Sequence, residues 1–124
     1  MRTNEIRELL LNELDKLKQS AGVRSVYFEE NPEDAMYPHV IISFSGVNLD
    51  DMNRKDFMID IDVYSLDNQE RFDIVDMIED TFVFKNAPQE TILPTFYLVS
   101  RVDIKEEDKS IKHTVIRLEC QNYG

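Results

Sequence analysis

Glycine and cysteine are scarce in this sequence. Its 124 residues include one Cys and three Gly. Cys120 alone can form neither an intramolecular disulfide nor a zinc site with several cysteine ligands. Glycines at positions 22, 46 and 124 cannot supply a phosphate-binding loop, a dinucleotide fingerprint or the Gly-x-Ser-x-Gly turn of hydrolases. These absences argue against the common nucleotide-using and hydrolase folds.

Basic residues and long apolar runs are scarce as well. Fourteen Lys and Arg stand against 25 Asp and Glu, which gives a formal net charge of −11. Such a charge repels both the phosphate backbone of nucleic acids and anionic lipid surfaces. No apolar run approaches the ~18 residues of a membrane span, and acidic residues interrupt the N-terminal apolar patch. We expect a protein made in the cytoplasm, with no signal peptide, no membrane contact and no sequence-specific nucleic-acid binding.

The rest of the composition is that of an ordinary globular protein. Hydrophobic residues make up 42% of the chain and charged residues 31%, with four Pro and no repeat or low-complexity segment. A chain of this length buries about two thirds of the surface that its unfolded form exposes. We predict one domain over residues 1–124 that folds unaided around one core.

Two stretches carry apolar side chains every three or four residues, the spacing of an amphipathic helix. Thr3 or Asn4 can cap the first helix, and Gly22 can end it. Asp67 followed by Glu70 resembles a capping box at the start of the second helix, which runs to about residue 82. The apolar stripes are Ile6, Leu9, Leu10, Leu14 and Leu17 in the first helix, and Ile74, Val75, Ile78 and Phe82 in the second.

Alternating apolar residues predict strands, and the clearest alternation is in residues 57–64. The predicted strands are 23–29, 39–44, 57–64, 96–104 and 114–120, separated by a loop at 30–38, a connection at 46–55 and a charged turn at 105–109. The order is therefore α-β-β-β-α-β-β. We predict the α+β class, with two helices packed on one face of a largely antiparallel sheet.

The face of the sheet opposite the helices, called the second face below, is too apolar for a wet surface. If the helices cover Ile59, Ile61, Leu98, Ile116 and Leu118, the second face carries Ile41, Met58, Tyr64, Tyr97, Val99, Ile111 and Val115, interleaved with Asp60, Asp62, Arg101 and Arg117. Such a face fits a surface that is covered in an oligomer. The alternative is that the protein's own long loops fold over it.

The carboxylates offer two weak metal sites. Asp60 and Asp62 point the same way from one strand and could bind a divalent cation with a third ligand, although a solvated strand face is the favoured interpretation. Glu107, Asp108 and Lys109 with Asp62 resemble the acidic and Glu-x-Lys arrangement of metal-dependent nucleases. The triplet lies in a predicted turn, and the net charge opposes a DNA substrate. We predict no metal and no cofactor.

The histidines and the cysteine give no catalytic motif. His39 and His113 belong to no metal-ligand or nucleophile pattern, and both are expected on the second face as interface or surface residues. Cys120 falls in register with Ile116 and Leu118, which makes it a small buried hydrophobe. We predict that the chain is not an enzyme.

The order of elements and several local strings resemble the tail-terminator or tail-completion proteins of long-tailed bacteriophages and of phage-like elements in bacterial genomes. The resemblance spans nearly the whole chain. The strings that carry it are the Leu-rich opening helix (6–17), FEE (28–30), YPHVII (37–42), NRKDF (53–57), IDIDVY (59–64) and RFDIVDMIE (71–79).

The resemblance implies a small structural subunit without catalytic residues or cofactors. It would form a ring, usually a hexamer, on the head-proximal end of the tail tube. There it would stop tube growth and offer a surface to the head connector. The implied partners are further copies of the chain, the tail tube protein and the connector or neck protein, and the implied location is the virion tail. We expect the second-face residues and the 46–55 connection to make the subunit contacts.

A different class of function remains open. A compact acidic α+β domain can also act as an inhibitor or immunity-like module that caps a basic toxin or nuclease by charge complementarity. A stable monomer that binds a basic partner would favour this class over a ring.

Asp50 and Asp51 in the 46–55 connection are candidate lumen carboxylates of such a ring. Carboxylates facing a channel repel the phosphates of passing DNA. Replacing both with Lys should slow or block DNA passage, which a loss of infectivity would measure. Unchanged infectivity would contradict a place in the lumen.

Overall fold

A computed structural model describes residues 2–49, 54–84 and 95–123. The helices are α1 (Thr3–Asp15), α2 (Leu17–Ser20) and α3 (Asn68–Glu79), which continues into the π-helical turn η1 (Asp80–Phe84). The strands are β1 (Ser25–Phe28), β2 (His39–Leu49), β3 (Arg54–Ser65), β4 (Thr95–Lys105) and β5 (Lys112–Tyr123). This order confirms the predicted α-β-β-β-α-β-β succession, to which the structure adds the short elements α2 and η1.

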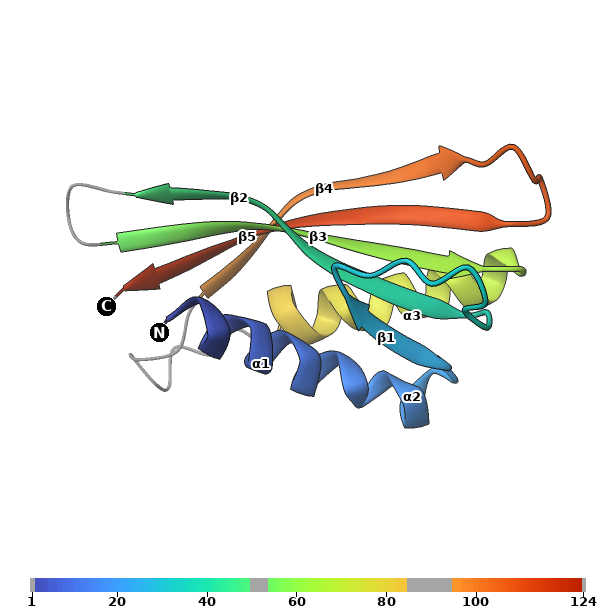
Figure 1. Cartoon of the computed structure of the whole chain (residues 1–124), viewed down its shortest axis with the longest axis horizontal. Helices are drawn as coiled ribbons and strands as arrows, with labels where there is room; N and C mark the ends of the chain where they lie inside the picture. Colours follow the sequence, from blue (N-terminus) through green and yellow to red (C-terminus); the bar gives the residue numbers. More distant parts are fainter. Residues whose placement is uncertain (1, 50–53, 85–94, 124) are drawn as a thin grey trace.

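The described strands form one twisted sheet in the order β1-β2-β3-β5-β4. Only the β1–β2 pair among them is parallel, and the pairs β2–β3, β3–β5 and β4–β5 are antiparallel. Helices α1 and α3 lie on the same face of this sheet (Figure 1). The α+β class and the largely antiparallel sheet with its helices on one face are therefore confirmed.

The core lies between the helices and the central strands. Ile59 and Ile61 of β3 face Leu118 and Ile116 of β5, and all four side chains are completely buried. The helices contribute the stripes that the sequence predicts, among them the fully buried Ile6, Leu10, Leu14, Ile74 and Ile78. Burying these side chains is the main driving force that holds the helices to the sheet.

Local signals in the sequence account for most helix ends. Asp67 accepts a hydrogen bond from the backbone N–H of Glu70 at 2.8 Å, so the predicted cap of α3 is confirmed. The first helix starts one residue earlier than predicted, because Arg2 is its N-cap and the Arg2 backbone N–H donates to Glu5 Oε1 at 2.9 Å. Gly22 follows α2 with φ +71°, a conformation that favours glycine.

Strands β2 and β3 are longer than the sequence predicts. β2 continues to Leu49 and β3 begins at Arg54, so most of the predicted 46–55 connection is paired strand. Gly46 is not a turn residue. It follows a bulge, because Phe44 pairs with Ile59 and Gly46 with Met58, which leaves Ser45 as the extra residue.

A second bulge interrupts β4. Leu98 pairs with Leu118 and Ser100 with Arg117, so Val99 is the extra residue. One extra residue transfers all following side chains to the opposite face of a strand. Val102 and Ile104, which the sequence assigns to the helix side with Leu98, therefore lie on the second face.

No helix in residues 2–49, 54–84 or 95–123 combines the length and the apolar character needed to cross a bilayer.

Leu10→Ala tests the position of the core. Leu10 is fully buried, so the substitution should lower the free energy of unfolding by about 2–5 kcal/mol in chemical denaturation. Leu66→Ala is the matched control, since Leu66 is 56% exposed and its truncation should change stability by less than about 0.5 kcal/mol. Equal effects of the two substitutions would contradict the packing of α1 on the sheet.

Candidate functional site

The second face of the sheet holds most of the predicted interface residues. Ile41, Met58, Tyr64, Tyr97 and Val115 occupy register positions that alternate with core residues on β2, β3, β4 and β5. Ile41 is nearly buried, Met58, Tyr64 and Val115 are half-buried, and Tyr97 is exposed. Ile111 is half-buried in the connection between β4 and β5, and Val99 is the exposed bulge residue. Their role in subunit contacts stays a prediction.

Arg101 does not belong to the second face. It pairs with the core residue Ile116, and its Nη1 lies 3.1 Å from Asp76 Oδ1 of α3 on the helix side. The bulge at Val99 places Arg101 on the helix side. The sequence pattern does not reveal this bulge, because apolar residues occur both before and after it. The same shift adds Val102 and Ile104, which are 52% and 41% exposed, to the second face.

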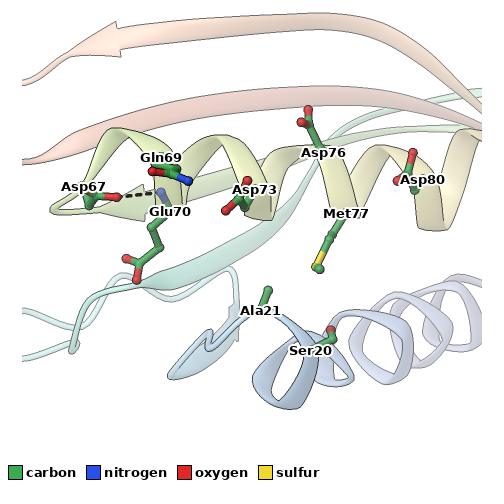
Figure 2. A pocket seen from close by; sticks show the side chains of 9 residues that line it. All are labelled: Ser20, Ala21, Asp67, Gln69, Glu70, Asp73, Asp76, Met77 and Asp80. Atoms are coloured by element: carbon green, nitrogen blue, oxygen red, sulfur yellow. Dashed lines mark hydrogen bonds between the residues drawn. The ribbon is translucent and has the colours of Figure 1, made fainter.

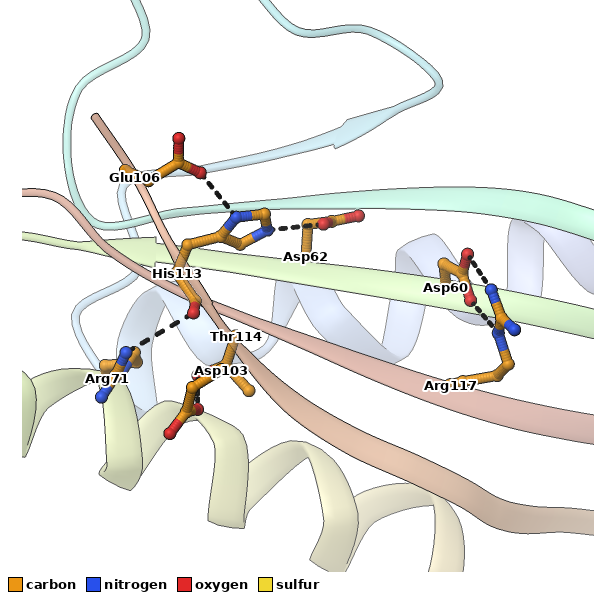
Figure 3. A network of polar contacts seen from close by, with 8 residues as sticks. All are labelled: Asp60, Asp62, Arg71, Asp103, Glu106, His113, Thr114 and Arg117. Atoms are coloured by element: carbon orange, nitrogen blue, oxygen red, sulfur yellow. Dashed lines mark hydrogen bonds and ion pairs between the residues drawn. The ribbon is translucent and has the colours of Figure 1, made fainter. Parts of the chain in front are cut away.

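The strand carboxylates are paired rather than freely solvated. Asp60 stands directly opposite Arg117, which donates from Nε and Nη2 to the two carboxylate oxygens at 2.8 and 3.1 Å (Figure 3). The hydrogen bond to Asp60 raises the pKa of Arg117. Asp60 and Arg117 therefore form a bidentate cross-strand pair on this face, where the Arg117 side chain stays exposed to solvent.

His113 is held between two carboxylates. Its Nε2 lies 2.6 Å from Asp62 Oδ1 and its Nδ1 lies 2.7 Å from Glu106 Oε1 (Figure 3). An ionised carboxylate can only accept hydrogen bonds, so with Asp62 and Glu106 both ionised this geometry fits an imidazole that carries a proton on each ring nitrogen. Burial lowers the pKa of His113, but the hydrogen bonds to Asp62 and Glu106 outweigh it, and the net shift is upward. The cation ties the connection after β4 to strand β3.

His39 and His113 lie on the second face, as predicted, but both are buried rather than on the surface of the single chain, and an interface role stays a prediction. Tyr64 stacks between them, with ring centroids 4.9 Å from His39 and 4.1 Å from His113. Tyr37 covers His39 from the loop after β1 at a centroid distance of 5.0 Å. Burial lowers the pKa of His39, and the nearby charge of His113 lowers it further. Burial also raises the pKa of Tyr64 to about 12.

The second face is thus covered at one end and open at the other. Tyr37 and Glu106 come from connections, so the alternative that the protein's own loops fold over this face holds at the histidine end. Toward β4 the face stays open and forms a hollow of about 370 Å³. Its lining combines the Asp60–Arg117 pair with apolar side chains, and consists of Asp60, Asp62, Ser100, Val102, Ile104, Val115 and Arg117.

Carboxylates from both weak metal sites have other partners in the described part of the chain. Within residues 2–49, 54–84 and 95–123, no three His, Cys, Asp or Glu side chains are placed to hold a metal ion. Asp62 is bound to His113, and Asp108 accepts hydrogen bonds from the backbone and hydroxyl of Ser110 in the connection between β4 and β5. Cys120 is fully buried, as predicted, and burial raises the pKa of its thiol to about 12.

The two candidate lumen carboxylates cannot be placed. Asp50 and Asp51 lie between β2 and β3, outside the described residues. Their proposed role depends on the sequence alone.

Comparison with known proteins identifies the fold. No family model matches the sequence, and no curated protein does either. Among the solved structures that share the fold, gp17 of bacteriophage SPP1 has a TM-score of 0.64 and 18% identity, over 98% of this chain and 93% of that one. A chain from the virion of a native gene transfer agent particle has a TM-score of 0.58 and 10% identity, over 90% and 84%.

The two histidines should give stability a maximum near pH 6.5. The pKa of His113 is raised above 6.5, so its contribution is complete below that pH and is lost as pH rises through the folded pKa. The pKa of His39 is lowered, so its contribution is present above 6.5 and is lost as pH falls through the folded pKa. Chemical denaturation across this range measures both slopes.

Matched glutamine variants separate the two contributions. His113→Gln should flatten the loss of stability above pH 6.5, and His39→Gln should reduce the loss below it. An unchanged alkaline slope in His113→Gln would show that the imidazole between Asp62 and Glu106 is not a cation.

Proposed function

We propose that this chain is a structural subunit of a phage or phage-like particle. It forms a ring, a hexamer by the resemblance, on the head-proximal end of the tail tube, ends tube growth and joins the tail to the head connector. It acts in the virion tail after assembly in the host cytoplasm. Its partners are further copies of itself, the tail tube protein and the connector protein, and it performs no catalysis.

The observation that carries this proposal is the agreement between the sequence and the fold. The strings that resemble tail-completion proteins run from the first helix to α3. The fold is similar to that of a bacteriophage protein over 98% of this chain. A chain from the virion of a gene transfer agent also has a similar fold.

The open part of the second face supports a role in assembly. Tyr97, Val99, Val102 and Ile104 are each at least 41% exposed and lie along one edge strand. Natural proteins protect a long apolar edge strand, because it readily pairs with other chains. Exposed apolar surface rimmed by charges such as the Asp60–Arg117 pair is typical of a protein–protein interface.

Light scattering behind a sizing column, with and without tail tube protein, tests the proposal directly. We expect a concentration-dependent species of several copies that appears as a ring in negative-stain images. A chain that stays monomeric in both conditions, and binds a basic protein instead, would replace the proposal with the inhibitor class.

Val102→Asp should weaken this assembly at least about tenfold, because a carboxylate would be buried in an apolar contact next to Asp60 and Asp62. Val47→Asp is the control, since Val47 is 44% exposed but pairs with Phe57 on the helix side of the sheet. The sizing-column measurement should separate the two variants. Equal assembly of both would exclude the second face as the contact surface.

A further inference from the structure

The hairpin formed by β4 and β5 carries a concentration of positive charge on an otherwise acidic protein. A hollow of about 480 Å³ lies between this hairpin and the start of α3. We call it the basic hollow, because its wall includes four cationic side chains, those of Arg71, Lys105, Lys109 and Lys112. The hairpin extends beyond the helical layer at one end of the molecule (Figure 1). A second chain could therefore reach the basic hollow.

Arg71 is the unusual member of this group. It is only 7% exposed, and its guanidinium contacts neutral acceptors: the His113 carbonyl oxygen at 3.5 Å and Asn68 Oδ1 at 3.2 Å. Its Nε is buried without a hydrogen-bond partner among the described residues, and no carboxylate in that part of the chain pairs with Arg71. The guanidinium carbon also lies 4.7 Å from the centroid of the Phe72 ring. A buried cation without a directly bound counter-charge is costly, so the position favours a further anion in the hollow.

Two carboxylates also line the basic hollow, and both already have partners. Asp103 accepts a hydrogen bond from the Thr114 hydroxyl at 2.7 Å, and Glu106 is bound to His113. Lys112 donates to the backbone oxygen of Lys109 at 2.9 Å. The positive charge of the hollow is therefore only partly offset within one chain.

The opposite side of α3 carries the complementary charge. Its acidic flank, which we define as Asp67, Glu70, Asp73 and Asp80, borders a hollow of about 550 Å³ between α3 and the end of α2. Figure 2 shows Asp73 on the side of α3 that faces α2, with Met77 pointing into the same gap. Asp67 and Glu70 take part in the cap of α3. Asp73 and Asp80 are exposed and make no ion pair in the described part of the chain.

We infer that a second copy of this chain places the acidic flank of its α3 in the basic hollow. The two patches have opposite charge and lie on opposite sides of one helix, so one copy cannot satisfy both. Contact between two different patches is heterologous, and it produces a closed ring when the rotation between copies closes. The inference rests on the proposed function and names the surfaces that would join the subunits.

Cysteine cross-linking tests the contact. A chain with both Asp73→Cys and Lys109→Cys, treated with a short bismaleimide, should give a ladder of covalent oligomers in a denaturing gel. Each single variant should stop at the monomer, because a head-to-tail contact never brings two copies of the same patch together. Cys120 is fully buried and should not react in the folded wild-type chain, which serves as the background. No ladder in the chain with both cysteines, or dimers in either single variant, would overturn the inference.

Charge exchange tests the electrostatic pairing without a cross-linker. Asp73→Lys with Asp80→Lys leaves the acidic flank with no net charge, and Lys105→Glu with Lys109→Glu does the same to the four cations of the basic hollow. Each double variant should self-associate at least about tenfold more weakly than the wild type, because the attraction between the two patches is then lost. An equimolar mixture of the two should associate as pairs, since the unchanged basic hollow of the first variant can bind the unchanged acidic flank of the second. Circular dichroism checks that both variants are folded.

The outcomes separate this inference from the proposed function. If the wild type forms rings and the charge variants form them equally well, the inference is wrong and the proposed function stands. If the wild type stays monomeric even with tube protein, both are wrong. Rings of the wild type, together with association of the charge variants only in the mixture, support both.

Discussion

The structure depends on the burial of one face of the central strand pair, β3 and β5. Ile59 and Ile61 on one strand and Ile116 and Leu118 on the other have no exposed surface, because α1 and α3 cover them. The stabilisation from apolar burial of this kind is proportional to the area removed from water. Since strand side chains alternate, fixing this face also fixes which residues must point the other way. The burial of the core residues therefore determines which side chains lie on the second face.

The bulge at Val99 determines the character of the second face at its outer edge. Without the extra residue, Val102 and Ile104 would continue the helix-side row of Leu98, and Arg101 would point to the second face. With it, Arg101 reaches Asp76 of α3, and the two apolar side chains join the open hollow beside Asp60 and Arg117. A single inserted residue thus places the charged Arg101 on the helix side and the apolar Val102 and Ile104 on the surface proposed for assembly.

His113 connects the two surfaces considered for subunit contact. Its imidazole joins Asp62 of the second face to Glu106 beside the basic hollow, and its carbonyl oxygen accepts a hydrogen bond from Arg71. Charge-assisted hydrogen bonds are stronger and more directional than neutral ones, so they keep the hairpin in one position relative to β3 and α3. A hairpin that is held in this way is better suited to recognise a partner than a freely moving one, because less ordering entropy is lost on binding.

The sequence by itself determined the class, the order of the elements, the cap of α3 at Asp67 and the burial of Cys120, because each depends on residues that are near one another in the chain or share a simple period. It also indicated that the second face is half apolar. Only the tertiary structure decided the bulges at Ser45 and Val99, and with them the length of β2 and the side on which Arg101 lies. Strand register is set by pairing with a distant neighbour, and local alternation carries no record of an inserted residue. The joining of His113 to Asp62, 51 positions apart, and the burial of Arg71 with its Nε unbonded among the described residues were likewise decided by packing between remote segments.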